Sequence, residues 1–369
     1  MVHAKVVKFG SVFLVTAGLI VGCGGSGSSS SSSDSSSSVE SELNYNGPGS
    51  KWDISLVDDG SFTITRRDSP VDPIDLTITG TYERLSSGFV SLVVGEASGV
   101  DAPSPGDEAW ALEVPGYAFL LKPVDSDQMV AMVESGDCPE GDFDANWVTV
   151  KKHAGSDASS ATQDFLGTFA FESATGTPSL PSKHALSAGY PNVTDGGIDG
   201  TGTCDAGLML VGDAPDQAAM YLTANGGAIV QTNIFDDDES SFIFGLQADN
   251  IDGTALDGDF SGMLFDDNMS DGSQINPVAF SCSGAVCTGN LVTDIETGTT
   301  SADGVTITFT GTLSDNFITG TIQDSDLNTA NLACMADQNA NGTTKTIVSC
   351  VGQSPGDNTK MFNVLFVSK

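Results

Sequence analysis

The chain has 369 residues, of which 13 are Lys or Arg and 49 are Asp or Glu, so its formal net charge is −36 at pH 7. This excess of negative charge excludes nucleic acid and anionic lipid headgroups as partners of the folded part. Between Lys183 and Lys345 there is no Lys or Arg at all, so the carboxylates of that stretch must be solvated, screened by salt or bound to cations. We expect a solvated acidic surface, with divalent cations as the alternative.

The first residues have the parts of a bacterial export signal. Lys5 and Lys8 supply positive charge, an apolar run of about a dozen residues follows, and Ile20-Val21-Gly22-Cys23 ends it. The run is shorter than the roughly 20 residues of a transmembrane helix. Its end resembles the lipobox of bacterial lipoproteins, which implies removal of residues 1–22 and lipid attachment at Cys23. The resemblance also implies the outer membrane, because position 24 is Gly24 rather than the aspartate that often retains lipoproteins at the inner membrane.

Residues 23–42 are mostly glycine, serine and acidic residues, a composition typical of a flexible tether. From Leu43 onward the chain reads as strands. Apolar and polar residues alternate at Ser61–Arg66, Asp75–Tyr82 and Val305–Leu313, the period of a sheet with one buried and one wet face. Turn residues separate these runs, and we find no amphipathic helix. The sequence therefore predicts an all-β fold of antiparallel meander barrels or sandwiches.

A change of composition at residues 153–163 predicts a linker between two β domains. The first domain would span 43–152, and the second, larger one 164–369, with an irregular Gly- and Pro-rich insert at 174–206. The two domains end on similar strands, Asn146–Lys151 and Asn363–Lys369. We therefore expect a diverged duplication of one β fold.

Six cysteines remain besides Cys23, an even number that favours disulfides. In Cys282–Cys287, a two-residue II′ turn at Gly284-Ala285 places the two cysteines opposite each other. A three-residue loop at 341–343 would pair Cys334 with Cys350 in the same way. Cys138 and Cys204 are left, and by elimination would pair with each other. Zinc is the alternative, but there is no C-x-x-C spacing and histidine is rare.

Each predicted domain opens with an aromatic residue shortly after a glycine, at Gly49-Ser-Lys-Trp52 and Gly167-Thr-Phe169. Followed by a meander, this arrangement is similar to the small up-and-down barrels of the lipocalin and avidin families. As a carrier of a small apolar ligand, such a barrel needs an open lumen lined by tryptophans. Trp52, Trp110 and Trp147 are the candidates for that lining, although we prefer to place them in the β core.

Candidate catalytic residues are few. His153 and His184 are the histidines of the mature chain, and we expect both in solvated loops. Glycoside hydrolysis needs only two carboxylates about 5–10 Å apart, for which residues on predicted strands, Glu83, Glu96, Glu113 and Glu134, would be the natural choices. We do not expect an enzyme.

One segment imitates the first half of a calcium-binding loop. Asp337, Asn339 and Asn341 have the alternate spacing of oxygen ligands, and Gly342 follows them. The bidentate glutamate expected six residues after the glycine is absent, since position 348 is Val348. We prefer an ordinary hairpin tip to a Ca²⁺ site.

The sequence thus predicts a β module anchored by lipid to the outer membrane, acting in binding or as a surface structure, with a protein or carbohydrate partner and no nucleic acid. A carboxylate-based glycoside hydrolase and a carrier of a small apolar ligand are the alternatives.

Overall fold

The structure is a computed structural model that describes residues 42–47, 51–68, 72–114, 116–124, 129–134, 138–152, 165–186, 189–192, 200–205, 207–212, 218–223, 228–231, 241–266, 275–338, 340, 343–355 and 357–369. Cys23, the lipobox, the predicted tether up to residue 41 and His153 lie outside these residues.

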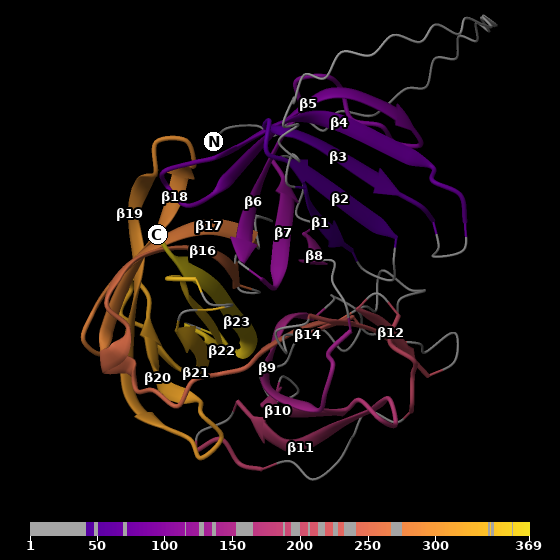
Figure 1. Cartoon of the computed structure of the whole chain (residues 1–369). Helices are drawn as coiled ribbons and strands as arrows, with labels where there is room; N and C mark the ends of the chain where they lie inside the picture. The colour runs from indigo at the N-terminus through magenta and orange to yellow at the C-terminus, as the bar shows by residue number, and fades with distance from the viewer. Residues whose placement is uncertain are drawn as a thin grey trace, which may run out of the picture. The chain divides into compact units, whose positions relative to one another are not determined.

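The first eight strands form a closed antiparallel barrel in which each strand pairs with the next, and β8 pairs with β1 (Figure 1). Inward side chains alternate with outward ones, as a pleated strand requires. Ile54, Leu56, Phe62 and Ile64, for example, share one interior cluster. The strands are β1 (Glu42–Asn46), β2 (Trp52–Val57), β3 (Ser61–Arg66), β4 (Leu76–Arg84), β5 (Val90–Gly99), β6 (Glu108–Val114), β7 (Ala118–Pro123) and β8 (Val130–Glu134).

A seven-stranded antiparallel sheet follows, in the order β11-β10-β9-β15-β14-β13-β12. Its two faces belong to different apolar clusters: Trp147 and Phe169 lie in one, and Val148 and Leu166 in another. The strands are β9 (Phe143–Lys152), β10 (Phe165–Glu172), β11 (Thr177–Ala185), β12 (Leu208–Val211), β13 (Ala218–Leu222), β14 (Ala228–Gln231) and β15 (Ser241–Leu246).

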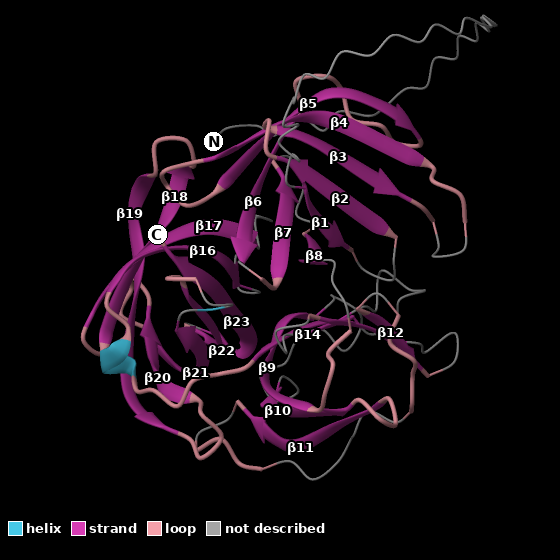
Figure 2. Cartoon of the chain, viewed as in Figure 1, coloured by secondary structure: helices cyan, strands magenta, loops and turns pink. Residues whose placement is uncertain are grey.

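The last eight strands form a second closed antiparallel barrel, preceded by a short 3-10 helix, η2 (Gly253–Ala255) (Figure 2). Phe260, Phe280, Phe362 and Phe366 fill its interior, and the rings of Phe280 and Phe366 lie 4.8 Å apart between centroids. The strands are β16 (Gly258–Asp266), β17 (Ile275–Ser283), β18 (Val286–Asp294), β19 (Thr299–Thr312), β20 (Ile318–Gln323), β21 (Thr329–Gln338), β22 (Thr346–Ser354) and β23 (Asp357–Ser368).

The predicted all-β class of antiparallel barrels or sandwiches is confirmed, and the structure has two closed barrels. The sheets do not follow the predicted domain limits. The first barrel ends at Glu134, and β9 (Phe143–Lys152), expected to close the first domain, pairs with β10 and β15 instead. The expected boundary after residue 152 therefore cuts the seven-stranded sheet. The two domain-ending strands that we expected to be duplicates also lie in different kinds of sheet. β9 lies in the open sheet and β23 in the second barrel.

The segment 174–206 is less irregular than predicted, because residues Thr177–Ala185 form β11. Pro178 and Pro181 made this strand hard to expect, since proline lacks the N–H that a central strand needs. In the structure β11 is an edge strand of the sheet that pairs with β10 and makes an isolated bridge from His184 to Asn192. The register between β10 and β11 shifts between Thr168 and Ala170. An edge strand with an irregularity is where a sheet tolerates proline.

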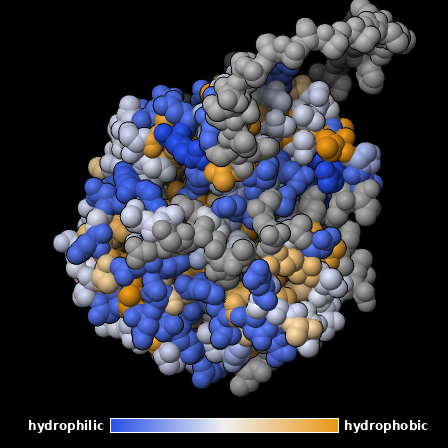
Figure 3. All heavy atoms as spheres, in the orientation of Figure 1, coloured by the Kyte–Doolittle hydropathy of each residue, from blue (hydrophilic) through white to orange (hydrophobic). Residues whose placement is uncertain are grey.

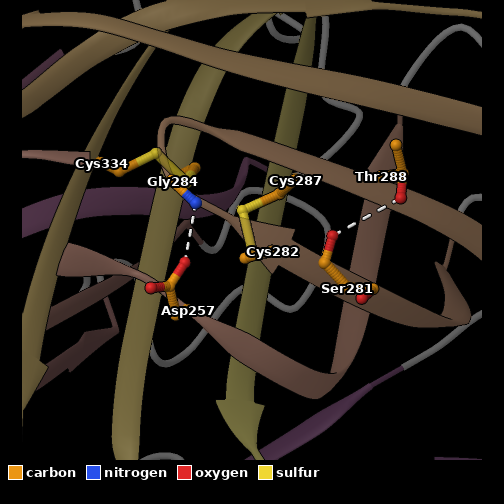
Figure 4. Close-up of a disulfide and its surroundings, with 8 residues drawn as sticks. Asp257, Ser281, Cys282, Gly284, Cys287, Thr288 and Cys334 are labelled. Carbon is orange, nitrogen blue, oxygen red and sulfur yellow. Dashed lines mark hydrogen bonds between the residues drawn. A yellow bond between two sulfur atoms is a disulfide. The ribbon is translucent and has the colours of Figure 1, made fainter. Parts of the chain in front are cut away.

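All three disulfides pair as the sequence predicts: Cys138–Cys204, Cys282–Cys287 and Cys334–Cys350. Cys282–Cys287 lies at the end of the β17–β18 hairpin, where the carboxylate of Asp257 accepts a hydrogen bond of 2.7 Å from the Gly284 N–H (Figure 4). Gly284 has φ +58, as the first central residue of a II′ turn requires.

The turn predicted for the β21–β22 hairpin is too tight. Cys334 does face Cys350, but regular pairing ends at Gln338 and Thr346, and the Ala340 N–H donates to the carbonyl of Lys345 at 2.9 Å. The connection is therefore longer than the three residues expected.

His184 is buried rather than a solvated loop residue. It lies on β11 with 7% of its surface exposed. Its Nε2 lies 3.0 Å from Oδ2 of Asp315, and its Nδ1 lies 3.1 Å from the carbonyl oxygen of Tyr190. Ser182 donates a second hydrogen bond of 2.7 Å to Asp315 Oδ2. The hydrogen bond from His184, together with that from Ser182, holds the pKa of Asp315 below its ordinary value.

We expect Asp315→Asn to lower the free energy of unfolding at pH 5.5 by about 1–3 kcal/mol, because it replaces the charged acceptor of two hydrogen bonds. A carboxyl with a lowered folded-state pKa stabilises the fold above its ordinary value of 3.8 and loses that contribution as pH falls through the folded-state pKa. The difference between wild type and variant in urea unfolding should therefore shrink from pH 5.5 to pH 2.5. A difference that is constant over this range would contradict the assignment.

Candidate ligand-binding site

The first barrel contains a cavity of about 370 Å³. Ligand pockets in proteins are commonly about 300–1,000 Å³, so this one has room for a small molecule. The residues that line it are mostly apolar: Trp52, Phe62, Ile64, Ile78, Leu92, Val94, Pro103, Gly106, Asp107, Glu108, Ala109, Leu121, Pro123, Val124 and Val130.

The lining residues come from one end of the barrel. Strand pairing places Trp52 beside Arg66, and Arg66 beside Leu76, at the ends of β2, β3 and β4. Ala109 pairs with Pro123 at the corresponding ends of β6 and β7. Pro103, Gly106 and Asp107, which follow β5, and Val124, which follows β7, therefore lie at the mouth of the cavity.

The space in the barrel follows from the size of the inward side chains. On β6 the inward positions carry Ala109 and Ala111, whereas Trp110 and Leu112 point to the outer cluster. Methyl groups at these two places leave room in front of Leu121, which pairs with Ala111. The second barrel has phenylalanine rings and two disulfides in its interior cluster instead.

An ion pair lies beside Trp52 of the cavity lining. Arg66 Nη2 lies 2.9 Å from Oδ2 of Asp75 and also donates to the carbonyl of Val100 at 3.2 Å. The guanidinium carbon lies 5.7 Å from the centroid of the Trp52 ring, within reach of a cation–π contact. The hydrogen bond to Asp75 raises the pKa of Arg66, so this pair is charged and internally neutralised at neutral pH.

Large exposed apolar residues occur beside this mouth. Ile74, Val100 and Val124 are each at least half exposed, and they precede β4, follow β5 and follow β7. Figure 3 shows hydrophilic residues over much of the face turned to the viewer, with apolar patches between them.

A polar network lies at the opposite end of the first barrel. Arg84 donates to both carboxylate oxygens of Glu113, at 2.7 and 2.9 Å, and the Tyr45 hydroxyl donates to Glu113 Oε1 at 2.9 Å. Desolvation raises the pKa of Tyr45, and it likewise raises that of Glu134. Glu113 is thus held by an arginine on one side of the network and a tyrosine on the other.

The carboxylates proposed for glycoside hydrolysis do not gather in the cavity. Glu83 and Glu96 are exposed on β4 and β5. Glu113 and Glu134 lie in or beside the polar network at the opposite end, and neither lines the cavity.

The three tryptophans are not brought together. Trp52 lines the cavity, whereas Trp110 packs edge-on against Phe89 outside the barrel interior, with ring centroids 5.7 Å apart. Trp147 belongs to the seven-stranded sheet, where its Nε1 donates to the carbonyl of Thr168 at 3.2 Å. Only Trp52 therefore has the position of a ligand contact.

The calcium-loop segment is described in part. Asp337 ends up in β21, where its Oδ2 accepts a hydrogen bond of 2.7 Å from the Tyr117 hydroxyl, and desolvation raises its pKa. Asn339 and Asn341 lie outside the described residues. Within the described ranges, no group of three or more His, Cys, Asp or Glu side chains is arranged to hold a metal ion. No described helix has the length and apolar character needed to cross a membrane.

Sequence reasoning missed the residues that give the cavity its mouth, Pro103, Gly106, Asp107 and Val124. The available signal was the pair of alanines at inward positions of β6, beside large inward residues such as Phe62, Leu92 and Leu121.

No protein-family model and no curated protein matches the chain. Two solved structures are similar to parts of it. One is a mutant of the vaccine antigen Transferrin Binding Protein B from Haemophilus parasuis Hp5, with 10% sequence identity and a TM-score of 0.28. That match covers 86% of this chain and 65% of the other, so this chain spans less than two thirds of its length.

The other similar structure is a protein of Bacteroides fragilis NCTC 9343 that is provisionally described as an outer membrane protein. Its identity is 13% and its TM-score 0.20, over 62% of this chain and 96% of the other. At these TM-scores neither similarity bears on function.

Proposed function

We propose that this protein is a lipoprotein of the outer membrane and that its first barrel binds a small apolar ligand without catalysing a reaction. The observation that carries the binding function is the apolar cavity of about 370 Å³ in the first barrel. Burial of apolar surface is the main driving force for such binding. A binding role needs only this cavity, whereas hydrolysis would need two carboxylates beside the bound substrate.

The affinity can be estimated from the apolar surface that a ligand loses to water. Ten methylene groups at about 0.8 kcal/mol each give roughly 8 kcal/mol, which corresponds to a Kd of about 1 µM. The loss of translational and rotational freedom weakens this value. We therefore expect Kd values between about 1 µM and 1 mM.

Titration of the full chain with N-phenyl-1-naphthylamine, a neutral apolar fluorophore, tests the binding function. The expected result is saturable enhancement of its emission with one site per chain, accompanied by a change in tryptophan emission because Trp52 lines the cavity. Replacing Trp52 by Leu should remove the change in tryptophan emission on binding and keep the enhancement of probe emission. Probe emission that does not saturate would contradict a defined site.

The anchor is supported by the lipobox-like Ile20-Val21-Gly22-Cys23. We expect Cys23→Ser to move the protein from the membrane fraction to the soluble fraction, because two or more acyl chains hold a protein at a membrane almost permanently. Gly24→Ala serves as the control and should remain in the membrane fraction. Membrane retention of the Cys23→Ser protein would exclude the lipid anchor.

A further inference from the structure

We propose that the ligand of the first barrel is a cationic amphiphile, an apolar chain that carries a protonated amine, with Asp107 and Glu108 meeting its charge at the rim of the cavity. This inference rests on the proposed function, since it requires the cavity to hold an apolar ligand. Phe62, Ile64 and Leu121 give the deeper wall no charge, and the charged members of the lining are the two carboxylates.

Asp107 is held in place at the mouth. It directly precedes β6, in the same alternation as the inward residues Ala109 and Ala111. Its Oδ2 accepts a hydrogen bond of 2.7 Å from the Ser104 N–H, and its carbonyl accepts one of 2.9 Å from the Val94 N–H on β5. The turn that carries this carboxylate is therefore held by one hydrogen bond within the turn and one to the neighbouring strand β5.

Two basic residues lie near this rim by strand position, Arg66 at the end of β3 and Lys122, which pairs with Trp110 across β6 and β7, and neither lines the cavity. Arg66 Nη2 and Nε bind the two carboxylate oxygens of Asp75, at 2.9 and 3.3 Å, so that pair is neutral as a whole. The charged residues of the lining itself are Asp107 and Glu108, which make it negative. Both are exposed, so an amine beside them keeps its contact with water while the chain enters the cavity.

The mouth thus separates two requirements that a ligand must meet. The apolar part gains from leaving water, whereas a charge that entered the interior would lose its hydration without a partner. A charge that stays at the exposed rim avoids this cost and interacts with the carboxylates across a partly hydrated gap. That interaction is screened by salt, so selectivity for the amine should fall as ionic strength rises.

The test is displacement of N-phenyl-1-naphthylamine from the full chain by decylamine, decanol and decanoate at pH 7 and low salt, each below its micellar concentration. These three compounds share one chain and differ in charge. We expect decylamine to bind about ten times more tightly than decanol, and decanoate to bind more weakly than decanol. The preference for decylamine should fall severalfold in 0.5 M NaCl.

Asp107→Asn and Glu108→Gln should each reduce the ratio of decylamine affinity to decanol affinity. Asp101→Asn is the matched control, because Asp101 is an exposed acid of the same loop that does not line the cavity. If Asp101→Asn reduced the preference for decylamine by the same factor, the effect would come from the surface charge as a whole, and the assignment would be overturned.

The outcomes separate the two proposals. If the probe and decanol bind but decylamine binds no more tightly, the cationic ligand is excluded and the apolar-ligand function stands. If decanoate is preferred, Arg66 rather than Asp107 governs the site and the inference is wrong. If neither the probe nor decanol binds, the proposed function fails and the inference fails with it.

Discussion

Ala109→Phe is expected to abolish binding of the apolar probe, with a Kd at least 30 times higher than that of the wild type. Ala109 is an inward residue of β6 and lines the cavity, where it pairs with Pro123 across the strand ladder. A benzyl group at this position would occupy the space that a ligand needs. Titration with N-phenyl-1-naphthylamine measures the effect, and thermal unfolding checks that the variant is folded.

Ala302→Phe is the matched control for this variant. Ala302 is exposed on β19 of the second barrel, so the same substitution there should leave probe binding unchanged. If Ala109→Phe is folded and binds the probe as the wild type does, the ligand occupies another part of the chain.

Gly80→Ala is expected to destabilise the protein by about 3 kcal/mol or more. The β4–β5 pairing shifts between Thr79 and Gly80, so that Gly80 faces Val94 and Gly95 is the additional residue on β5. A Cβ at Gly80 would fall on the carbonyl oxygen of Val93 and within 2.7 Å of the Phe62 ring. The backbone oxygen cannot rotate away, so the barrel wall must shift, and overpacking of this kind typically costs 1–3 kcal/mol or more.

Gly95→Ala gives the control on the same bulge. Its Cβ would meet only ordinary contacts, the nearest being the Thr79 carbonyl oxygen at 3.4 Å. Urea unfolding should therefore give a change within about 1 kcal/mol for Gly95→Ala. If both variants lost a similar amount of unfolding free energy, the bulge as a whole, rather than the space at Gly80, would determine the stability.

The sequence was sufficient to predict what depends on local pattern. Alternation at Ser61–Arg66 gave a strand with the same limits in the structure. The Cys282–Cys287 pairing followed from a two-residue turn, whose geometry is set by Gly284 and its immediate neighbours.

What the sequence could not supply depends on long-range pairing. Nothing local to Phe143–Lys152 states that its neighbours are β10 and β15 rather than a strand of the first barrel. His184 is a similar case, because its burial depends on Asp315, which lies 131 positions away. The local composition of residues 174–206 predicted an irregular segment, although part of it forms the edge strand β11.

The candidate site was foreseen only through Trp52. The lumen depends on the combined volume of inward residues from most of the strands, Ala109 and Ala111 of β6 among them. The second barrel has the same number of strands, yet its interior is occupied by the rings of Phe260, Phe280 and Phe366 and by two disulfides. Strand pattern alone does not distinguish these two cases.

The most direct measurement is anomalous diffraction from crystals of the full chain grown with 1-bromodecane, whose bromine marks its own position. The central claim is that the first barrel holds an apolar ligand. It predicts a bromine peak inside that barrel, among the side chains of Phe62, Ile64 and Leu121, or at its mouth beside Trp52. Bromine found only in the second barrel or on the seven-stranded sheet, with the first barrel empty, would contradict it.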